Sequence, residues 1–497
     1  MNSFRRVLAR SLMAAFALSF VAPLIATAKP KPQTAQQQQP ITAPSPAPMP
    51  TTSGTPIPYP AYGTPAPDVA HLQQRPGIPV KITLNQATDI AVVQSPAFAS
   101  ERAAYREIAA RVGAEEGALF PAVSGSASIG RNYGSGVGAT AAPSASPSAA
   151  RTYYTSESAG LSISQLIFDG GADIAAIRSA KTADLAGKDT LLRQLQTLAY
   201  TVAQTYYALL EDEANVASDD ALVREFQVNE NYVRAEIRTG AAARSDLAAA
   251  QFETAQARGA LVTAQGAVIT AEATFATTLG LDADTQILPQ QLPAAPKQIK
   301  LLSYAQSLQE AYALRPDYLS AEYTVESDQD NLRYEKLTRW PTITASGTAG
   351  VGRDLYPGVP VSGMNSTESL GATLSLPIYD QGLTNYNIAV AAGTLDQAIA
   401  SMTQTRLSVQ SDVRGGLATL ISDRAALVEA QAEVTSATVS LQATQAQYRV
   451  GASTITAVVT AEANLATAQA AYISALYTER LAEQNYAYAL GASDLTL

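Results

Sequence analysis

The sequence contains no cysteine and a single histidine, His71. Disulfide bridges, catalytic thiols and thiolate metal sites are therefore excluded, and packing alone must hold the fold. One histidine cannot complete an HExxH metal site, and His71 lies in a proline-rich stretch rather than beside a nucleophile. We therefore predict no catalytic residue, no metal site and no cofactor, and the chain is not expected to be an enzyme.

Long apolar runs are scarce as well, and the main one stands at the N-terminus. Three arginines precede an apolar segment over residues 11–25, and small residues follow up to Ala28. This pattern is typical of a secretory signal peptide, which we assign to residues 1–28 with cleavage after Ala28. The apolar core is shorter than the ~20 residues of a membrane-spanning helix. If the mature chain enters a membrane, it must do so as a closed β-barrel.

Basic residues are in the minority, with 33 against 43 acidic ones and a formal net charge of −10, or −13 after loss of the three leader arginines. An acidic chain of this kind does not suit nucleic acid, and no nucleic-acid partner is predicted.

Proline is concentrated in one segment. Residues 29–79 hold 14 of the 27 prolines together with four consecutive glutamines. Such a segment cannot bury enough apolar surface to offset its loss of conformational entropy. We predict a disordered Pro/Gln-rich tail over 29–79 that is dispensable for assembly.

The rest of the chain is an internal duplication. Up to the start of the strands, landmarks of the first half recur 220 residues later in the second half. Beyond the strands the offset is 211 residues. The two repeats therefore differ in the length of the loop between their two strands. We predict a first repeat over 80–281, a linker over 282–299 and a second repeat over 300–497. The matching landmarks are Pro96 with Pro316, Phe120-Pro121 with Trp340-Pro341, Ile167-Phe168-Asp169 with Ile378-Tyr379-Asp380, Gly171 with Gly382, Gly240 with Gly451, and Leu279-Gly280 with Leu490-Gly491.

Each repeat contains one very long helix. Apolar residues with coiled-coil spacing predict long helices over 171–239 and 382–450. A glycine ends each of them, and helices over 241–279 and 452–490 would return antiparallel. The seam residues are Leu191, Leu195, Leu198, Val202 and Leu209 in the first repeat, and Val413, Leu420, Leu427, Val434, Leu441 and Tyr448 in the second.

Alternating residues predict a β-hairpin in each repeat, at about 121–168 and about 341–379. From residue 369 to 378, apolar side chains alternate with small or polar residues, as in transmembrane β-strands. A hairpin packed on a soluble core is the alternative, but the helices offer no broad apolar face for it. Since bacterial outer-membrane barrels have at least eight strands, four strands require oligomerisation.

The strand-to-helix passages Ser164–Asp169 and Ser375–Asp380, and the segments Arg238–Gly240 and Tyr448–Gly451, resemble those of TolC-like outer-membrane efflux proteins. The resemblance extends over residues 80–497. It implies a mixed α and β membrane protein, in which a homotrimer combines a long antiparallel α-helical coiled-coil barrel with a 12-stranded transmembrane β-barrel.

The same resemblance implies a location and partners. The barrel would lie among the lipids of the outer membrane of a Gram-negative bacterium, and the helices would extend into the periplasm. A periplasmic adaptor and an inner-membrane pump would dock there, so that the channel-tunnel serves as a passive exit duct for efflux or type I secretion. The alternative is a structural coiled-coil envelope protein without a pore, which would not need two lipid-facing hairpins.

The resemblance further implies roles for the helix-to-helix turns. In the family, polar links between neighbouring helices close the periplasmic gate. Asp246, which follows Ser245, matches the aspartate of these links, and Tyr448 matches their tyrosine. Ser453 stands where the family has the arginine partner. Two ring aspartates are replaced by Ala457 and Thr460. The adaptor-contacting residues would be Thr239, Gly240, Ala241, Val450, Gly451 and Ala452.

Asp246 is expected to supply the acidic constriction from the first repeat. Arg244 lies two residues away and so points to another helix face, which leaves the carboxylate of Asp246 without a predicted local partner.

Overall fold

A computed structural model describes residues 80–135, 151–240, 242–291, 301–356 and 363–492, all within the unit Pro60–Leu497. The predicted leader and tail, residues 1–79, lie outside the described residues. In chain order the elements are β1 (Val80–Ile82), α3 (Leu84–Gln94), α4 (Pro96–Gly117), β2 (Ala122–Ser135), β3 (Arg151–Phe168), α5 (Ala172–Thr239), α6 (Arg244–Thr278), β4 (Ile287–Pro289), α7 (Tyr304–Leu314), α8 (Pro316–Leu337), β5 (Thr342–Leu355), β6 (Asn365–Ser375), α9 (Leu383–Arg449) and α10 (Ile455–Leu490).

Two helices dominate the fold. α5 has 68 residues and α9 has 67, so each is about 100 Å long at ~1.5 Å per residue. Val202 and Leu209 on α5, like Val413 and Leu420 on α9, are fully buried, which confirms these seam positions. None of the helices described here is both long and apolar enough to cross a membrane.

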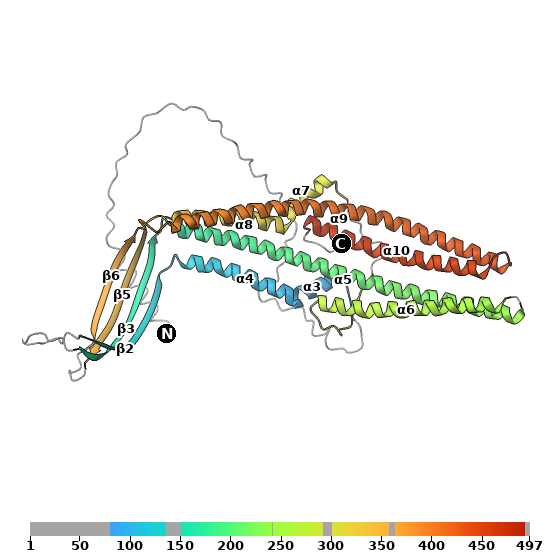
Figure 1. Cartoon of the computed structure of the whole chain (residues 1–497), viewed down its shortest axis with the longest axis horizontal. Coiled ribbons are helices and arrows are strands. Elements are labelled where there is room, and N and C mark those ends of the chain that lie inside the picture. The colour runs from blue at the N-terminus through green and yellow to red at the C-terminus, as the bar shows by residue number, and fades with distance from the viewer. Residues whose placement is uncertain (1–79, 136–150, 241, 292–300, 357–362, 493–497) are drawn as a thin grey trace, which may run out of the picture. The chain divides into compact units, whose positions relative to one another are not determined.

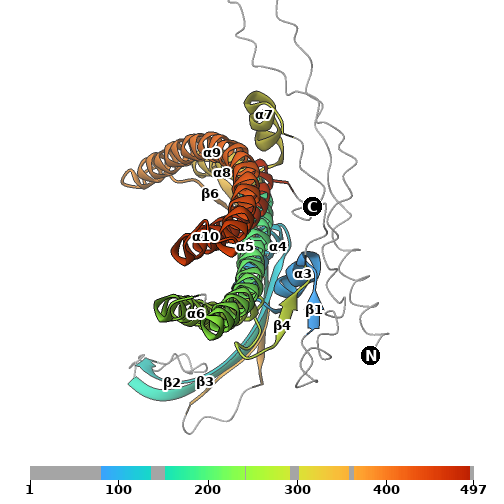
Figure 2. The same cartoon turned by 90° about the vertical axis from the view of Figure 1, so that its right-hand side faces the viewer.

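Each long helix has two shorter partners that lie one after the other along it (Figure 1). α4 and α6 pack on α5, and α8 and α10 pack on α9. The two repeats meet where α5 contacts α8 and α10. Viewed along the helices, α6, α5, α10 and α9 follow one another as neighbours (Figure 2).

The strands of the two repeats form one antiparallel sheet in the order β2-β3-β5-β6. β3 pairs with β5, so the hairpins of the two repeats are joined in the middle of the sheet. β2 and β6 are its edges. The sheet follows directly from α4 and α8 and leads directly into α5 and α9, as Figure 1 shows.

The two faces of the sheet differ in chemistry. On one face, hydroxyl groups pair across strands, with 2.7 Å between the Oγ atoms of Ser124 and Ser162 and 2.7 Å between Thr348 and Ser369. The other face presents apolar side chains such as Leu370, which is 83% exposed. The period-2 pattern of the sequence therefore produces one polar face and one exposed apolar face.

An aspartate and a glycine turn the chain from strand into long helix in both repeats. Asp169 accepts hydrogen bonds from the backbone N–H groups of Gly171 and Asp173, and Asp380 accepts them from Gly382 and Thr384. These bonds satisfy N–H groups that a helix start leaves without partners. Gly171 and Gly382 have φ of 91° and 85°, which glycine adopts without strain.

Three boundaries differ from those expected from the sequence. β6 ends at Ser375 rather than continuing to residue 379, because Pro377 has no N–H group for the ladder. α6 begins at Arg244 and α10 at Ile455, each three residues later than predicted. The residues between each long helix and its return helix form the turn and are not part of either helix. The predicted linker over 282–299 contains a strand, β4.

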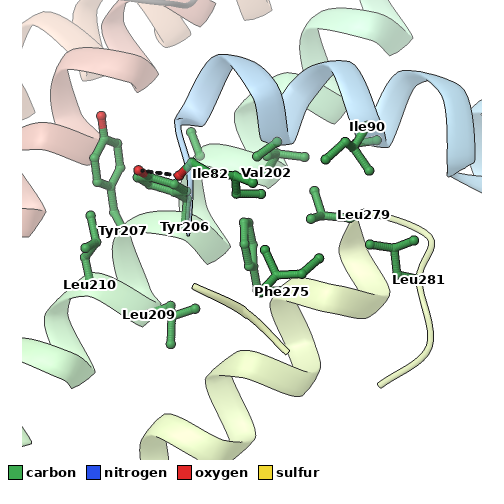
Figure 3. Close-up of a cluster of buried hydrophobic side chains, with 14 residues drawn as sticks. Ile82, Ile90, Val202, Tyr206, Tyr207, Leu209, Leu210, Phe275, Leu279 and Leu281 are labelled. Atoms are coloured by element: carbon green, nitrogen blue, oxygen red, sulfur yellow. Dashed lines mark hydrogen bonds between the residues drawn. The ribbon is translucent and has the colours of Figure 1, made fainter. Parts of the chain in front are cut away.

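β4 closes the first repeat by pairing in parallel with β1. A buried apolar cluster from α3, α5 and α6 packs beside this pair (Figure 3). The Tyr206 hydroxyl donates to the backbone oxygen of Gln290 at 2.7 Å and lies 3.3 Å from that of Ile82. Burial, with a smaller effect of Tyr207, raises the pKa of Tyr206 to about 12, so the hydroxyl remains a donor at physiological pH.

The end of each repeat packs on the junction between its first two helices. Gly280 lies against the backbone of Gln94, the last residue of α3, and Gly491 lies against Arg315, between α7 and α8. The Arg315 guanidinium is 2% exposed and contacts Asp317 at 2.6 Å and Asp412 at 2.9 Å. A buried cation therefore connects α8, α9 and the end of α10.

Candidate functional site

The turns between α5 and α6 and between α9 and α10 contain the residues for which a function was predicted. Gly240 and Gly451 have φ of 80° and 75°, the left-handed conformation in which helices commonly end. The N–H of Gly240 donates to Ile237 O at 3.1 Å, and the N–H of Gly451 donates to Tyr448 O at 2.9 Å. Glycine therefore allows the chain to reverse here without backbone strain.

The helices that follow the turns begin differently in the two repeats. A carboxylate oxygen of Asp246 accepts the N–H of Ala243 at 3.2 Å, and the other lies 3.3 Å from the Ser245 hydroxyl. In α10 the Thr454 hydroxyl instead accepts the N–H of Ala457 at 3.3 Å. The expectation that Asp246 has no local partner is wrong, because an acid at the third helical position can cap the helix start.

A tyrosine connects the two turns. The Tyr448 hydroxyl on α9 donates to the Glu236 carboxylate on α5 at 3.1 Å. Burial raises the pKa of Tyr448 to about 12, with further contributions from Glu236 and Asp246. The pKa of Tyr232 is also raised, mainly by its hydrogen bond with Glu236. Glu236 therefore acts as the shared acceptor between the repeats at this end.

Apolar packing supports this polar contact. A buried cluster draws residues from all four helices next to the turns, and Tyr448 packs on its edge. Its buried members are Val233, Ala250, Leu441, Ile455, Val458, Ala461 and Leu465.

The remaining predicted residues lie at the surface of the turns. The Thr239 hydroxyl donates to Glu236 O at 2.9 Å. Val450 is 78% exposed, Gly451 and Ala452 are also exposed, and Ser453 is partly exposed. Ala241 lies outside the described residues. The turns thus present small and apolar groups at the surface.

Sequence reasoning missed two acids of this region. Glu236 lies about one turn before Gly240, and Tyr448 about one turn before Gly451, so their nearness to the two turns was the available signal. Glu462 is 1% exposed on α10, and its burial has no clear signature in the sequence.

Comparison with known proteins agrees with this architecture. The model of the outer membrane efflux protein family matches residues 88–281 and 307–492. The outer membrane efflux protein BepC of Brucella suis is 25% identical over 327 residues, which cover 66% of this chain and 70% of BepC. The outer membrane protein TolC of Escherichia coli is 26% identical over 200 residues, 37% of this chain and 39% of TolC.

Solved structures show the same fold. A membrane protein from Pseudomonas aeruginosa superposes with a TM-score of 0.71 at 20% identity, covering 83% of this chain and 91% of that one. The CmeC outer membrane channel of Campylobacter jejuni has a TM-score of 0.69 at 19% identity, with coverages of 82% and 85%. The chain is an outer-membrane protein and belongs to the outer membrane efflux protein family.

Proposed function

We propose that three copies of this chain form a channel-tunnel, which serves as a passive exit duct through the outer membrane. The four strands of each copy would contribute to a closed barrel of 12 strands, and the long helices would form a tunnel across the periplasm. Substrates would be driven by an inner-membrane pump through a periplasmic adaptor, in efflux or type I secretion.

The open sheet is the observation that carries this proposal. In the described chain β2 and β6 each pair on one side only, so both edges leave backbone groups available for a further strand. Within lipid these groups need partners, and closure of the sheet through neighbouring copies supplies them. The exposed apolar face, including Leu161 and Leu370, suits contact with lipid, and the hydroxyl-rich face suits a water-filled interior.

The helices support the same assembly. α6 exposes Phe252, Val262 and Ile269 at 65–68%, and α9 exposes Val428 at 67%. Exposed large apolar side chains of this kind suit packing against another protein surface. Packing against the helices of neighbouring copies would cover it and close the tunnel wall.

The turns supply the surface for the adaptor. Thr239, Gly240, Ala241, Val450, Gly451 and Ala452 would make this contact, and the gate would comprise Ser245, Asp246, Tyr448 and Ser453. The short side chains of these turns allow a partner helix or loop to approach closely.

Two measurements test the duct. Crosslinking of the purified protein in detergent should give a trimer, and planar bilayers should show ion conductance. A trimer that never conducts would favour the second candidate, a structural coiled-coil envelope protein without a pore.

Asp246→Asn is expected to weaken the cation selectivity of the channel while leaving the trimer intact. Three carboxylates near the axis attract cations, and a narrow mouth of low dielectric strengthens this field. Asparagine retains an oxygen that can accept the Ala243 N–H, so the start of α6 should persist. The reversal potential under a salt gradient measures the change.

Asp282→Asn is the matched control, since it removes the same charge from an exposed position outside the turns. Its reversal potential should equal that of the wild type. Equal values for Asp246→Asn and wild type would place Asp246 away from the constriction.

A further inference from the structure

A buried carboxyl group lies between the two repeats close to the turns. Glu462, in the second turn of α10, is 1% exposed. Its carboxylate oxygens lie 3.3 and 3.4 Å from the side-chain nitrogen of Asn229 on α5. Its neighbours Ala461 and Leu465 belong to the apolar cluster at the turns. A titratable side chain is therefore buried in the interface between α10 and α5.

The groups that face Glu462 do not compensate a negative charge. α5 contributes Glu225 besides Asn229, α6 contributes Glu253, and α9 contributes the amide of Gln445. The two charged groups among these, Glu225 and Glu253, are both acids. The ionised form would thus be buried beside two like charges, with only amide hydrogen bonds to stabilise it.

These surroundings determine the proton affinity. Burial, followed by the charge of Glu225, raises the pKa of Glu462 from 4.5 to about 7, against the hydrogen bonds of Asn229 and Gln445. Burial also raises the pKa of Glu253. The carboxyl group of Glu462 thus changes charge near neutral pH.

We propose that Glu462 is a proton-operated switch, which holds the α9–α10 hairpin against the α5–α6 hairpin when protonated and loosens this contact when ionised. The apolar cluster and the Tyr448–Glu236 bond lie at the same end of the helices. Separation at Glu462 would therefore be transmitted to both turns.

The direction of the pH effect follows from linkage. The packed state binds the proton more tightly than a hydrated, separated state, whose pKa is near 4.5. Below that value the group does not weaken the contact. As the pH rises from about 4.5 to about 7, the ratio of separated to packed forms increases about tenfold per unit, on the order of a hundredfold in all, and it then stays constant.

Glu462→Gln tests the switch, since glutamine has the same shape and cannot ionise. In the wild-type trimer the thermal unfolding temperature should fall between pH 5 and pH 8. The unfolding temperature of Glu462→Gln should fall less over this range. It should equal that of the wild type at pH 5 and be higher than that of the wild type at pH 8. The exposed Glu433→Gln on α9 is the matched control and should follow the wild type throughout.

Conductance supplies a second readout, which rests on the proposed function. The open fraction of wild-type channels should rise at least tenfold from pH 5 to pH 8, and that of Glu462→Gln should stay low. Parallel pH profiles of wild type and Glu462→Gln in both assays would overturn the switch. Absence of conductance with the expected unfolding profile would overturn the duct alone.

Glu225→Gln keeps the proposal testable if Glu462→Gln does not assemble. Removing the neighbouring charge should lower the pKa of Glu462 and shift the pH profile to more acidic values without abolishing it. An unshifted profile would contradict the switch.

Discussion

Gly280→Ala is expected to lower the free energy of unfolding by about 3–4 kcal/mol. A Cβ atom at Gly280 would lie 2.5 Å from the backbone oxygen of Gln94, and φ there is +80°. The left-handed conformation costs roughly 1–2 kcal/mol for alanine, and overpacking against fixed backbone adds ~1–3 kcal/mol. Thermal unfolding in detergent, followed by circular dichroism, gives the change.

Gly240→Ala separates these two contributions. Its φ is also +80°, but a Cβ atom would meet nothing within 4 Å. This variant should lose only about 1–2 kcal/mol, the cost of the backbone conformation. Equal losses in the two variants would show that the end of α6 can move away from the α3–α4 junction.

Arg315→Met is expected to cost about 3 kcal/mol and to reduce the yield of trimer. The substitution removes the buried cation that pairs with Asp317 on α8 and Asp412 on α9 and leaves both carboxylates in place. Breaking a buried ion pair from one side costs roughly 3–5 kcal/mol, and the lower end applies because the two acids are partly exposed.

The effect of Arg315 should depend on pH. Burial opposes ionisation of Asp317, but the hydrogen bonds from Arg315 and the charge of Arg193 outweigh it and lower the pKa of Asp317. This contribution is therefore present above pH ~4 and is lost as the pH falls further. The difference in the free energy of unfolding between the wild type and Arg315→Met should therefore become smaller below pH ~4. Arg333→Met, exposed on α8, should match the wild type at every pH.

Periodicity and duplication predicted the main elements because each depends on local pattern. The coiled-coil seam located α5 and α9, and residue alternation located one strand of each hairpin. β1 and β4 were missed since strands of three residues carry too little pattern. Their pairing depends on contact between residues about 200 positions apart, which no local signal reports.

At the turns, the repeat identified Gly240 and Gly451, and the family resemblance identified Asp246 and Tyr448. It did not find how they are used. The bond of Tyr448 with Glu236 and the cap formed by Asp246 require knowledge of which helix faces meet. The burial of Glu462 likewise arises from the packing of four helices and not from its neighbours in the chain.

The parallel pair of β1 and β4 has a consequence for the order of folding. It joins Val80 to Ile287, so closing this loop from an open chain would be entropically costly. Helical hairpins form from local contacts and are faster. We expect α5 and α6 to pack together first, starting at the turn at Gly240. This packing places the end of α6, and β4 after it, beside α5 before β1 pairs with β4. The β1–β4 pair and the hydrogen bond of Tyr206 would then be the last native contacts of this repeat to form, after the packed helices have brought the two strands near each other.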